Sequence, residues 1–338
     1  EFDPDDEKNG LTVPYILARI EQGAHPVLEA RALYGGATQA LSHYIEPLRG
    51  VERIYPQFHL HAQANARWST VDPPLAQLPR ALRDIIIPDP GMVWLVYDWD
   101  QIELRINAAL SNDLSTLQAF ERGEDIHTLN VCTIFGWPQP PELREPWAAE
   151  ANRAWLEARK WAWGDKDDPR RVFAKRFEYR LDYGGSPKNA GSIPGSRQLG
   201  LNGENLVHAS VRWLTAHPQK AQWRREIAAQ VSKRGLPMLR TFLGRRRIFL
   251  AEGPKRVREA LDFPMQAGVS DIANLTAVQI KQTIPWLKLV WQMHDGWWWT
   301  CPEDRGEETK PRLRELVERV WTINSREVRF PATFKEVR

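Results

Sequence analysis

The spacing of apolar residues along the chain predicts many helices and few strands. Helical intervals of three and four residues recur in the stretches 11–50, 101–120, 171–183, 204–235 and 256–284. Pro218 interrupts the fourth stretch, the fifth is expected to be helical after an early Pro264, and Gly184-Gly185 is a typical stop signal after the third. We therefore expect most of the chain to be helical.

Strand-like runs are shorter and end at acidic residues. The apolar run 92–97 stops at Asp98, and the pattern of residues 287–301 predicts two strands around His294-Asp295-Gly296. Residues 51–66 are mixed and polar, which is compatible with short strands, and the tryptophans 297–299 are expected to pack beneath the second acidic position. A few strands among many helices predict an α+β fold.

The composition indicates a globular protein with clusters of basic residues. The chain has 338 residues, 42% hydrophobic and 26% charged, which is enough for a sizeable core. The net charge is only +3, but basic residues cluster at Arg170-Arg171, Arg224-Arg225 and Arg245 to Arg247. Such patches suit a nucleic-acid partner, although a single cluster is more often an ordinary solvated surface.

The two cysteines and the first residues of the chain indicate in which cellular compartment the protein is expected. Cys132 and Cys301 are far apart and form neither a disulfide framework nor a metal-ligand spacing, which suits a reducing compartment. The first residues, 1–8, are acidic and lack the apolar core of a signal peptide, and no apolar run reaches about 18 residues. We expect an intracellular protein (in the cytoplasm or nucleoid, a virus-infected cell or an organelle) that is not secreted and has no membrane partner.

Two carboxylates at strand ends are the first candidate chemistry. If the strands that end at Asp98 and Asp295 lie side by side, the two carboxylates repel each other unless a cation lies between them. Hard oxygen ligands select Mg²⁺, and two ions about 3.5–4 Å apart clamp the oxygens of phosphoryl transfer. The alternative is structural, because Asp295-Gly296 between two apolar runs is also a strong signal for a type I′ hairpin turn.

A stripe of four residues is the second candidate. Arg171, Lys175, Tyr179 and Tyr183 follow one another at steps of four, so they drift by about 40° per step and share one helix face about 120° wide. Two cations followed by two aromatic rings suit a nucleotide, with phosphates at one end and the base at the other. An amphipathic helix with a basic surface would show the same stripe.

These segments, in this order, resemble the motifs of the family A DNA polymerases. Residues 98–105 (DWDQIELR) resemble motif A, the stripe from Arg171 to Gly184 resembles motif B, and residues 292–295 (QMHD) resemble motif C. Four connecting segments are also similar to the family: 66–75 (ARWSTVDPPL), 122–128 (RGEDIHT), 241–247 (TFLGRRR) and 258–266 (REALDFPMQ). The resemblance covers residues 40 to 338.

The resemblance implies a right-hand polymerase, with an antiparallel palm sheet, helical fingers and a partial or reduced helical thumb. The expected domains are a thumb at 1–48, a first palm part at 49–120, fingers at 121–255 and a second palm part at 256–338. Residues 137–170 form a Trp-rich insertion in the expected fingers. No proofreading exonuclease is expected within this chain.

The resemblance also implies the catalytic and metal-binding residues. Asp98 and Asp295 would be the catalytic carboxylates and, with the backbone carbonyl of Trp99, would hold two Mg²⁺ ions, for which Mn²⁺ is expected to substitute. Lys175 would protonate the leaving pyrophosphate. Two departures accompany this assignment: Gly296 stands where the family usually has a glutamate, and Asp100 stands where serine is common. By charge alone, Asp100 could partly replace the lost acid.

Further roles come from the same resemblance. The implied nucleotide-binding residues are Gln101, Glu103, His127, Arg171, Lys175 and Tyr179. Glu103 would exclude a ribose 2′-OH, and Tyr179 would pack on the incoming sugar and base. The implied DNA-binding residues are Arg67, Tyr183, Arg258, Gln266, Gln292 and His294. Contacts in the minor groove would test base-pair geometry and not sequence.

The implied activity is that of a DNA-directed DNA polymerase that extends a primer with dNTPs. The expected partners are primer–template DNA and dNTPs, together with replisome proteins or a separate exonuclease. One alternative is a single-subunit RNA polymerase, which Glu103 argues against. The other is a catalytically silent DNA-binding remnant, which the presence of Asp98, Asp295, Lys175 and Arg171 argues against.

Overall fold

The computed structural model divides into two compact units. A helical unit comprises Glu1–Ser42 and Ser115–Ala221, and a sheet unit comprises His43–Leu114 and Gln222–Arg338. The residues that the structure describes are 27–137, 157, 167–185, 193, 195–196, 199–201, 203–233, 235–293 and 296–337. Most of the predicted insertion at 137–170 therefore lies outside the described residues, as do His294 and Asp295. Within the described part of the chain, no helix is long and apolar enough to cross a membrane.

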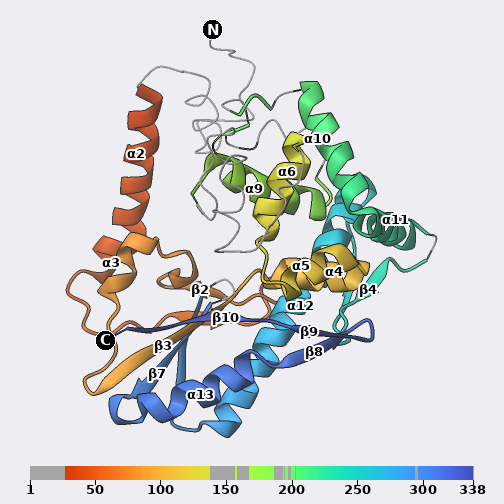
Figure 1. Cartoon of the computed structure of the whole chain (residues 1–338). Helices are drawn as coiled ribbons and strands as arrows, with labels where there is room; N and C mark the ends of the chain where they lie inside the picture. Colours follow the sequence, from red (N-terminus) through yellow and green to blue (C-terminus); the bar gives the residue numbers. More distant parts are fainter. Residues whose placement is uncertain are drawn as a thin grey trace. The chain divides into compact units, whose positions relative to one another are not determined.

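The sheet unit is built on four antiparallel strands in the order β10-β3-β7-β6. These strands are β3 (Met92–Trp99), β6 (Lys288–Met293), β7 (Gly296–Pro302) and β10 (Ala332–Val337). Figure 1 shows the orange strand β3, from the first third of the chain, beside the blue strands β7 and β10 from its end. The two strands predicted within residues 287–301 are thus confirmed as β6 and β7, which pair with each other.

Helices and short ribbons surround this sheet. The helices are α3 (Glu46–Leu48), α4 (Ile102–Ser111), α12 (Gly253–Thr283) and α13 (Gly306–Val317), with 3-10 turns at Leu75–Gln77, Arg80–Ile85 and Glu303–Arg305. The ribbons are β1 (Gln57–His59) with β2 (Ser69–Val71), β4 (Met238–Arg240) with β5 (Arg246–Ile248), and β8 (Val320–Ile323) with β9 (Arg326–Arg329). Helix α12 packs against α4 and α13, and α13 packs against β3 and β7.

Tryptophans fill the core of the sheet unit. Trp297 and Trp299 are almost fully buried on one face of β7, stacked at 6.5 Å between ring centroids. Trp298 points to the other face and packs against Trp291 of β6 and Trp94 of β3. The indole N–H of Trp99 donates to the carbonyl of Val317 at 3.0 Å, which fastens β3 to α13. The predicted packing of the three tryptophans is confirmed, although on both faces of the sheet, and their position relative to Asp295 concerns a residue outside the described part of the chain.

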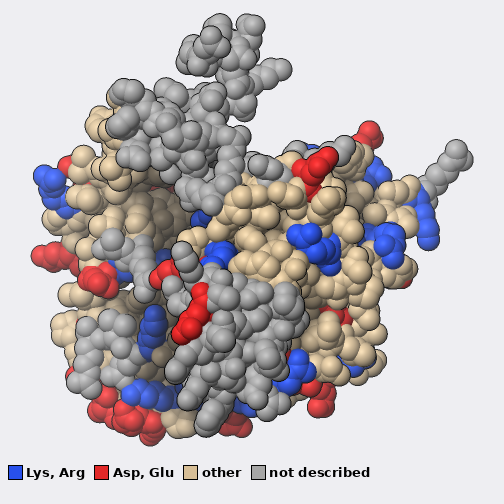
Figure 2. Space-filling view, turned by 45° about the horizontal axis from the view of Figure 1, so that its top comes forward, with Lys and Arg blue, Asp and Glu red and all other residues tan. Residues whose placement is uncertain are grey.

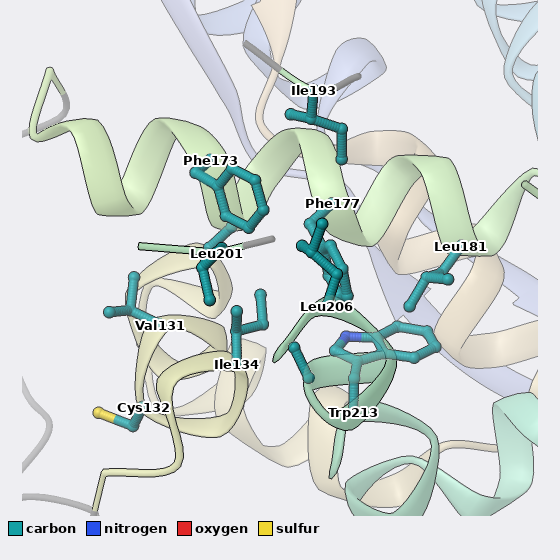
Figure 3. Close-up of a cluster of buried hydrophobic side chains, with 12 residues drawn as sticks. Val131, Cys132, Ile134, Phe173, Phe177, Leu181, Ile193, Leu201, Leu206 and Trp213 are labelled. Carbon is teal, nitrogen blue, oxygen red and sulfur yellow. The ribbon is translucent and has the colours of Figure 1, made fainter. Parts of the chain in front are cut away.

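An apolar cluster packs α6, α9 and α10 of the helical unit against one another. The elements of this unit are α2 (Val27–Ala40), the π-helix Leu41–Ile45 at its edge, α5 (Leu114–Glu121), α6 (Ile126–Phe135), α9 (Pro169–Asp182), α10 (Gly203–Ala216) and the start of α11 (Pro218–Ser232). Figure 3 shows Phe173, Phe177 and Leu181 of α9 directed toward side chains of α6 and α10. These three positions recur every four residues, so they form the buried stripe of the helix.

The predicted helix over 101–120 is two helices. Asn112 has a left-handed backbone (φ 59°), and its N–H caps α4 by donating to the carbonyls of Ala108 and Ala109. Asparagine tolerates this conformation better than most residues, and the reversal ends α4 before α5 begins. Apolar spacing alone does not register such a break. The other predicted helices appear where they are described, with a break before Pro218, whereas α12 continues through Pro264 without interruption.

Candidate functional site

Asp98 lies near the end of β3 on a central strand of the sheet. Its neighbours Tyr97 and Trp99 are buried on one face, so the alternation of a strand directs Asp98 to the other face, where it is exposed. Its cross-strand partners are Thr333 on β10 and Gly296 on β7. The sheet therefore presents a carboxylate between two strands that come from the end of the chain.

Gly296 is the residue that follows Asp295 in the sequence, and the space around it is narrow. A Cβ atom built on Gly296 would lie 3.2 Å from the carbonyl oxygen of Met293 and 3.8 Å from Oδ1 of Asp98. The first distance is tighter than an ordinary contact, which favours glycine at this position. The second means that a side chain at position 296 would lie beside the Asp98 carboxylate.

Asp100 is directed to the opposite neighbour of β3. Its Oδ1 accepts a hydrogen bond of 3.0 Å from the hydroxyl of Thr333, and its N–H donates to the carbonyl of Pro331 at 2.9 Å. Both partners belong to the β10 side, whereas position 296 belongs to β7. The Asp100 carboxylate is thus bound on the side away from the position of the missing acid.

Three of the predicted DNA and nucleotide contacts meet in one hydrogen-bonded group, here called the Arg67 network. Arg67 forms an ion pair with Glu103, and its N–H donates to the side chain of Asn65 at 3.1 Å. The Asn65 amide in turn donates to the side-chain oxygen of Gln266. The network joins the segment before β2, the first turn of α4 and the middle of α12.

Asp262 is the fifth member of this network, and the sequence reasoning missed it. It lies one helical turn before Gln266 on α12, and its carboxyl is near enough to Glu103, Arg67 and Gln266 for each of them to act on its pKa. Burial raises the pKa of Asp262, and the charge of Glu103 raises it further, to about 6, although Arg67 and Arg247 act in the opposite direction. The only sequence signal was its place inside the segment 258–266.

Other predicted contacts of the sheet unit lie apart from the Arg67 network. Arg258 is exposed on α12, and Gln292 is buried on β6 opposite Trp297. Gln101 has a left-handed backbone (φ 54°) and precedes the first residue of α4. His294 and Asp295 lie outside the described residues.

The motif B stripe lies on α9 of the helical unit. Arg171 donates to both oxygens of Asp125, at 2.5 and 3.1 Å, and Asp125 also caps the start of α6. Burial would raise the pKa of Asp125, but the hydrogen bond and charge of Arg171 outweigh it and lower that pKa. Lys175 is exposed, and the rings of Tyr179 and Tyr183 stack at 5.8 Å. The helix thus displays the cations and rings that the spacing predicted.

Behind this stripe is a second feature that the sequence reasoning missed, here called the buried charge cluster. Lys220 is fully buried, with its ammonium 3.2 Å from Glu178 and 3.5 Å from Asp182 on the inward face of α9. The other Glu178 oxygen lies 3.3 Å from Nδ1 of His127, which is itself buried against Tyr179. His127 is therefore a buried partner of Glu178 in this structure.

Charge in the buried cluster is strongly compensated. Burial raises the pKa of Glu178, but Lys220 and His127 outweigh that effect and hold it down, to about 2. The Lys220 ammonium also lies 5.2 Å from the centre of the Trp213 ring. Acidic residues four apart on α9 were the signal that could have revealed the cluster, since Phe177 and Leu181 beside them mark the inward face.

The last two features of the site are the charges on the surface and the side chains that could bind a metal ion. On the described part of the face seen in Figure 2, Lys and Arg side chains are interspersed with Asp and Glu, without one continuous basic surface. Among the residues that the structure describes, no group of three or more His, Cys, Asp or Glu side chains could hold a metal ion. Asp98 supplies an exposed carboxylate of the kind that Mg²⁺ prefers. Its predicted partner, Asp295, lies outside the described residues.

Known proteins resemble this chain in both sequence and fold. The family model "DNA polymerase family A" matches residues 6–145. The thermostable DNA polymerase I of Thermus thermophilus is 27% identical over 94% of the chain, and that of Thermus filiformis is 28% identical over 90%. The chain spans 37% and 35% of the length of these two relatives.

A solved structure agrees. The POL domain of Pol1 from M. smegmatis, in complex with DNA primer-template and dNTP, matches 97% of this chain and 55% of its own with a TM-score of 0.77 at 22% identity. This match confirms the predicted α+β fold. Together with the family model and the relatives, it makes the chain similar in sequence and in fold to the family A DNA polymerases.

Proposed function

We propose that this chain is a DNA-directed DNA polymerase domain that extends a primer on a DNA template by nucleotidyl transfer from dNTPs. One observation carries the proposal: the pairing of β3 with β7 puts Asp98 opposite Gly296, the residue that follows Asp295 in the sequence. Strands from motif A and motif C are thus direct neighbours, as a shared pair of aspartates requires.

In this proposal, Asp98, Asp295 and the carbonyl of Trp99 would hold two Mg²⁺ ions, or Mn²⁺ in their place. When bound, the ions would stabilise the charge of the attacking and leaving oxygens. Arg171 binds the triphosphate as a fork, Lys175 donates a proton to the leaving pyrophosphate, and the Tyr179 ring packs on the incoming nucleotide. Both cations lie on the helix α9.

The remaining proposed roles concern the sugar and the DNA. Glu103 excludes a ribose 2′-OH, while Arg67 and Gln266 contact the primer end in the minor groove. The ligands in the M. smegmatis structure, a DNA primer-template and a dNTP, support the same ligands here. We propose an intracellular location, with replisome proteins or a separate exonuclease as further partners.

Primer extension tests the proposal directly. The chain is incubated with a labelled primer–template, Mg²⁺ and either dNTPs or ribonucleotides, and extension is followed on a gel. We expect extension with dNTPs, its loss in Asp295→Asn with DNA binding retained, and normal extension in Asp304→Asn, a control at an exposed position. A preference for ribonucleotides would favour an RNA polymerase, and DNA binding without any extension would indicate a silent remnant.

A further inference from the structure

The Arg67 network keeps the proposed DNA contacts bound to one another. Arg67 is paired with Glu103, and Gln266 accepts a hydrogen bond from Asn65. If Arg67 is to reach a base edge of the primer, its guanidinium must loosen this ion pair. The environment of the carboxylates beside it must then change as DNA binds, and this inference rests on the proposed function.

Asp262 is a second carboxylate, besides Glu103, whose electrostatic surroundings include Arg67. Helix α4 packs against α12 and brings Glu103 near Asp262, while β5 contributes Arg247. Arg247 is already paired with Glu259 of α12 at 2.6 Å, and Arg67 is paired with Glu103. Within the described residues, no cation forms an ion pair with Asp262 itself.

Acidic residues outnumber basic residues in the described group around Asp262. Among these described residues, Glu103, Asp262 and Glu259 carry three negative charges, and Arg67 and Arg247 carry two positive charges, which is one negative charge more. Arg258, one turn before Asp262 on α12, is exposed to solvent, where water screens its charge. A proton shared by the Asp262–Glu103 pair would remove the excess.

We propose that Asp262 is a positioning residue for Arg67, and that moving Arg67 from Glu103 to the primer end is accompanied by uptake of one proton at the Asp262–Glu103 pair. The proton comes from solvent and forms an O–H bond on one carboxylate, and no other bond is made or broken. Loss of the Arg67 charge and arrival of the DNA phosphates both favour the protonated carboxyl.

The titration of Asp262 supports the same direction. Its pKa is already raised to about 6 by burial and by Glu103 while Arg67 is in place. Without Arg67 it must be higher, so the complex binds more protons than the free chain above pH 6. Linkage then makes primer binding weaken as pH rises, by up to about tenfold per pH unit for one proton.

The experiment measures DNA affinity as a function of pH. A fluorescently labelled primer–template is titrated with the full chain between pH 5.5 and 8.5 at constant ionic strength, without dNTPs, and the dissociation constant is read from anisotropy. Four proteins are compared: the unaltered chain, Asp262→Asn, Asp262→Glu, which keeps the carboxyl group, and Asp304→Asn, which removes one exposed acid of the same unit. Histidine titration contributes equally to all four.

The expected result is a difference in slope. Asp262→Asn should bind DNA about tenfold or more tightly than the unaltered chain at pH 8, with the two affinities converging by pH 5.5. Asp262→Glu and Asp304→Asn should follow the unaltered chain. The same slope in Asp262→Asn as in the unaltered chain would overturn this inference alone, whereas absence of DNA binding at every pH would overturn the proposed function and the inference with it.

Discussion

Asp98 on β3 lies directly opposite Gly296 on β7, and its Oδ1 is 3.8 Å from the place where a Cβ of residue 296 would be. The resemblance to motif C implies a glutamate at this point, so the glycine leaves no acid at the immediate side of Asp98. Because Asp100 is bound toward β10, it does not fill that place in this structure. Asp98 and Asp295 are therefore the carboxylates on which the proposed metal site depends.

A matched pair of variants separates the two neighbouring aspartates of motif A. Asp98→Asn should lower primer extension on the order of a thousandfold, because it removes a charge that stabilises the transition state. Asp100→Asn should retain extension within a few-fold, because its carboxylate is held by Thr333. Single-turnover extension rates measure both, and equal losses in the two variants would contradict the assignment.

Because Glu103 is also the ion-pair partner of Arg67, we expect it to affect both sugar selection and primer binding. Glu103→Ala should admit ribonucleotides, and it should also release Arg67 and so change primer affinity. Glu103→Gln keeps the size of the side chain and should preserve most of the sugar selectivity while still weakening the pair. Ribonucleotide-to-deoxynucleotide ratios and primer dissociation constants are measured on both. Unchanged sugar selectivity in Glu103→Ala would remove this residue from the gate role.

Tyr179 carries a hydroxyl on the proposed nucleotide face of α9. A hydroxyl there can stand in for a missing sugar 3′-OH, so we expect ready incorporation of dideoxynucleotides. Tyr179→Phe should reduce that incorporation while keeping the ring against Tyr183 and His127. The measured quantity is the ratio of dideoxy to deoxy incorporation, and the idea is wrong if both proteins give the same ratio.

The buried charge cluster should stabilise the helical unit in a pH-dependent way. The pKa of Glu178 falls from its ordinary 4.5 to about 2 on folding, so its contribution is present above pH 4.5 and is lost between pH 4.5 and 2. Glu178→Gln should cost about 3–5 kcal/mol at pH 7, because Lys220 loses a buried partner. Thermal melts by circular dichroism would show this.

A double variant supplies the control for that prediction. Glu178→Gln with Lys220→Met removes both charges, so it should be less destabilised than the sum of the two single changes. Destabilisation equal to that sum would mean that the two side chains do not interact energetically.

Local patterns predicted much of this fold, for identifiable reasons. The strands that became β3, β6 and β7 are short apolar runs ended by polar residues, and α9 has apolar residues every four positions. Such signals depend only on neighbours in the chain. The break between α4 and α5 at Asn112 was not predicted, because it depends on one left-handed residue and leaves the apolar spacing intact.

The site was predicted in part because its motifs are contiguous. Arg171, Lys175, Tyr179 and Tyr183 share a helix face that can be read from spacing alone. The pairing of Arg67 with Glu103, and the nearness of Asp262, depend on packing between α4 and α12, which are far apart in the sequence. The burial of Lys220 was not predicted, because a lysine is expected at the surface and only its partners on α9 explain why it is buried.

The two cysteines give each unit an independent chemical reporter. Cys132 is buried in the apolar cluster of the helical unit (Figure 3), and Cys301 is buried on β7 of the sheet unit, so neither thiol can react until its surroundings open. Because the sequence contains only these two, a thiol reagent followed by peptide mass analysis yields two separate opening rates. The native chain can thus report which half loosens first under heat or denaturant, without an engineered label.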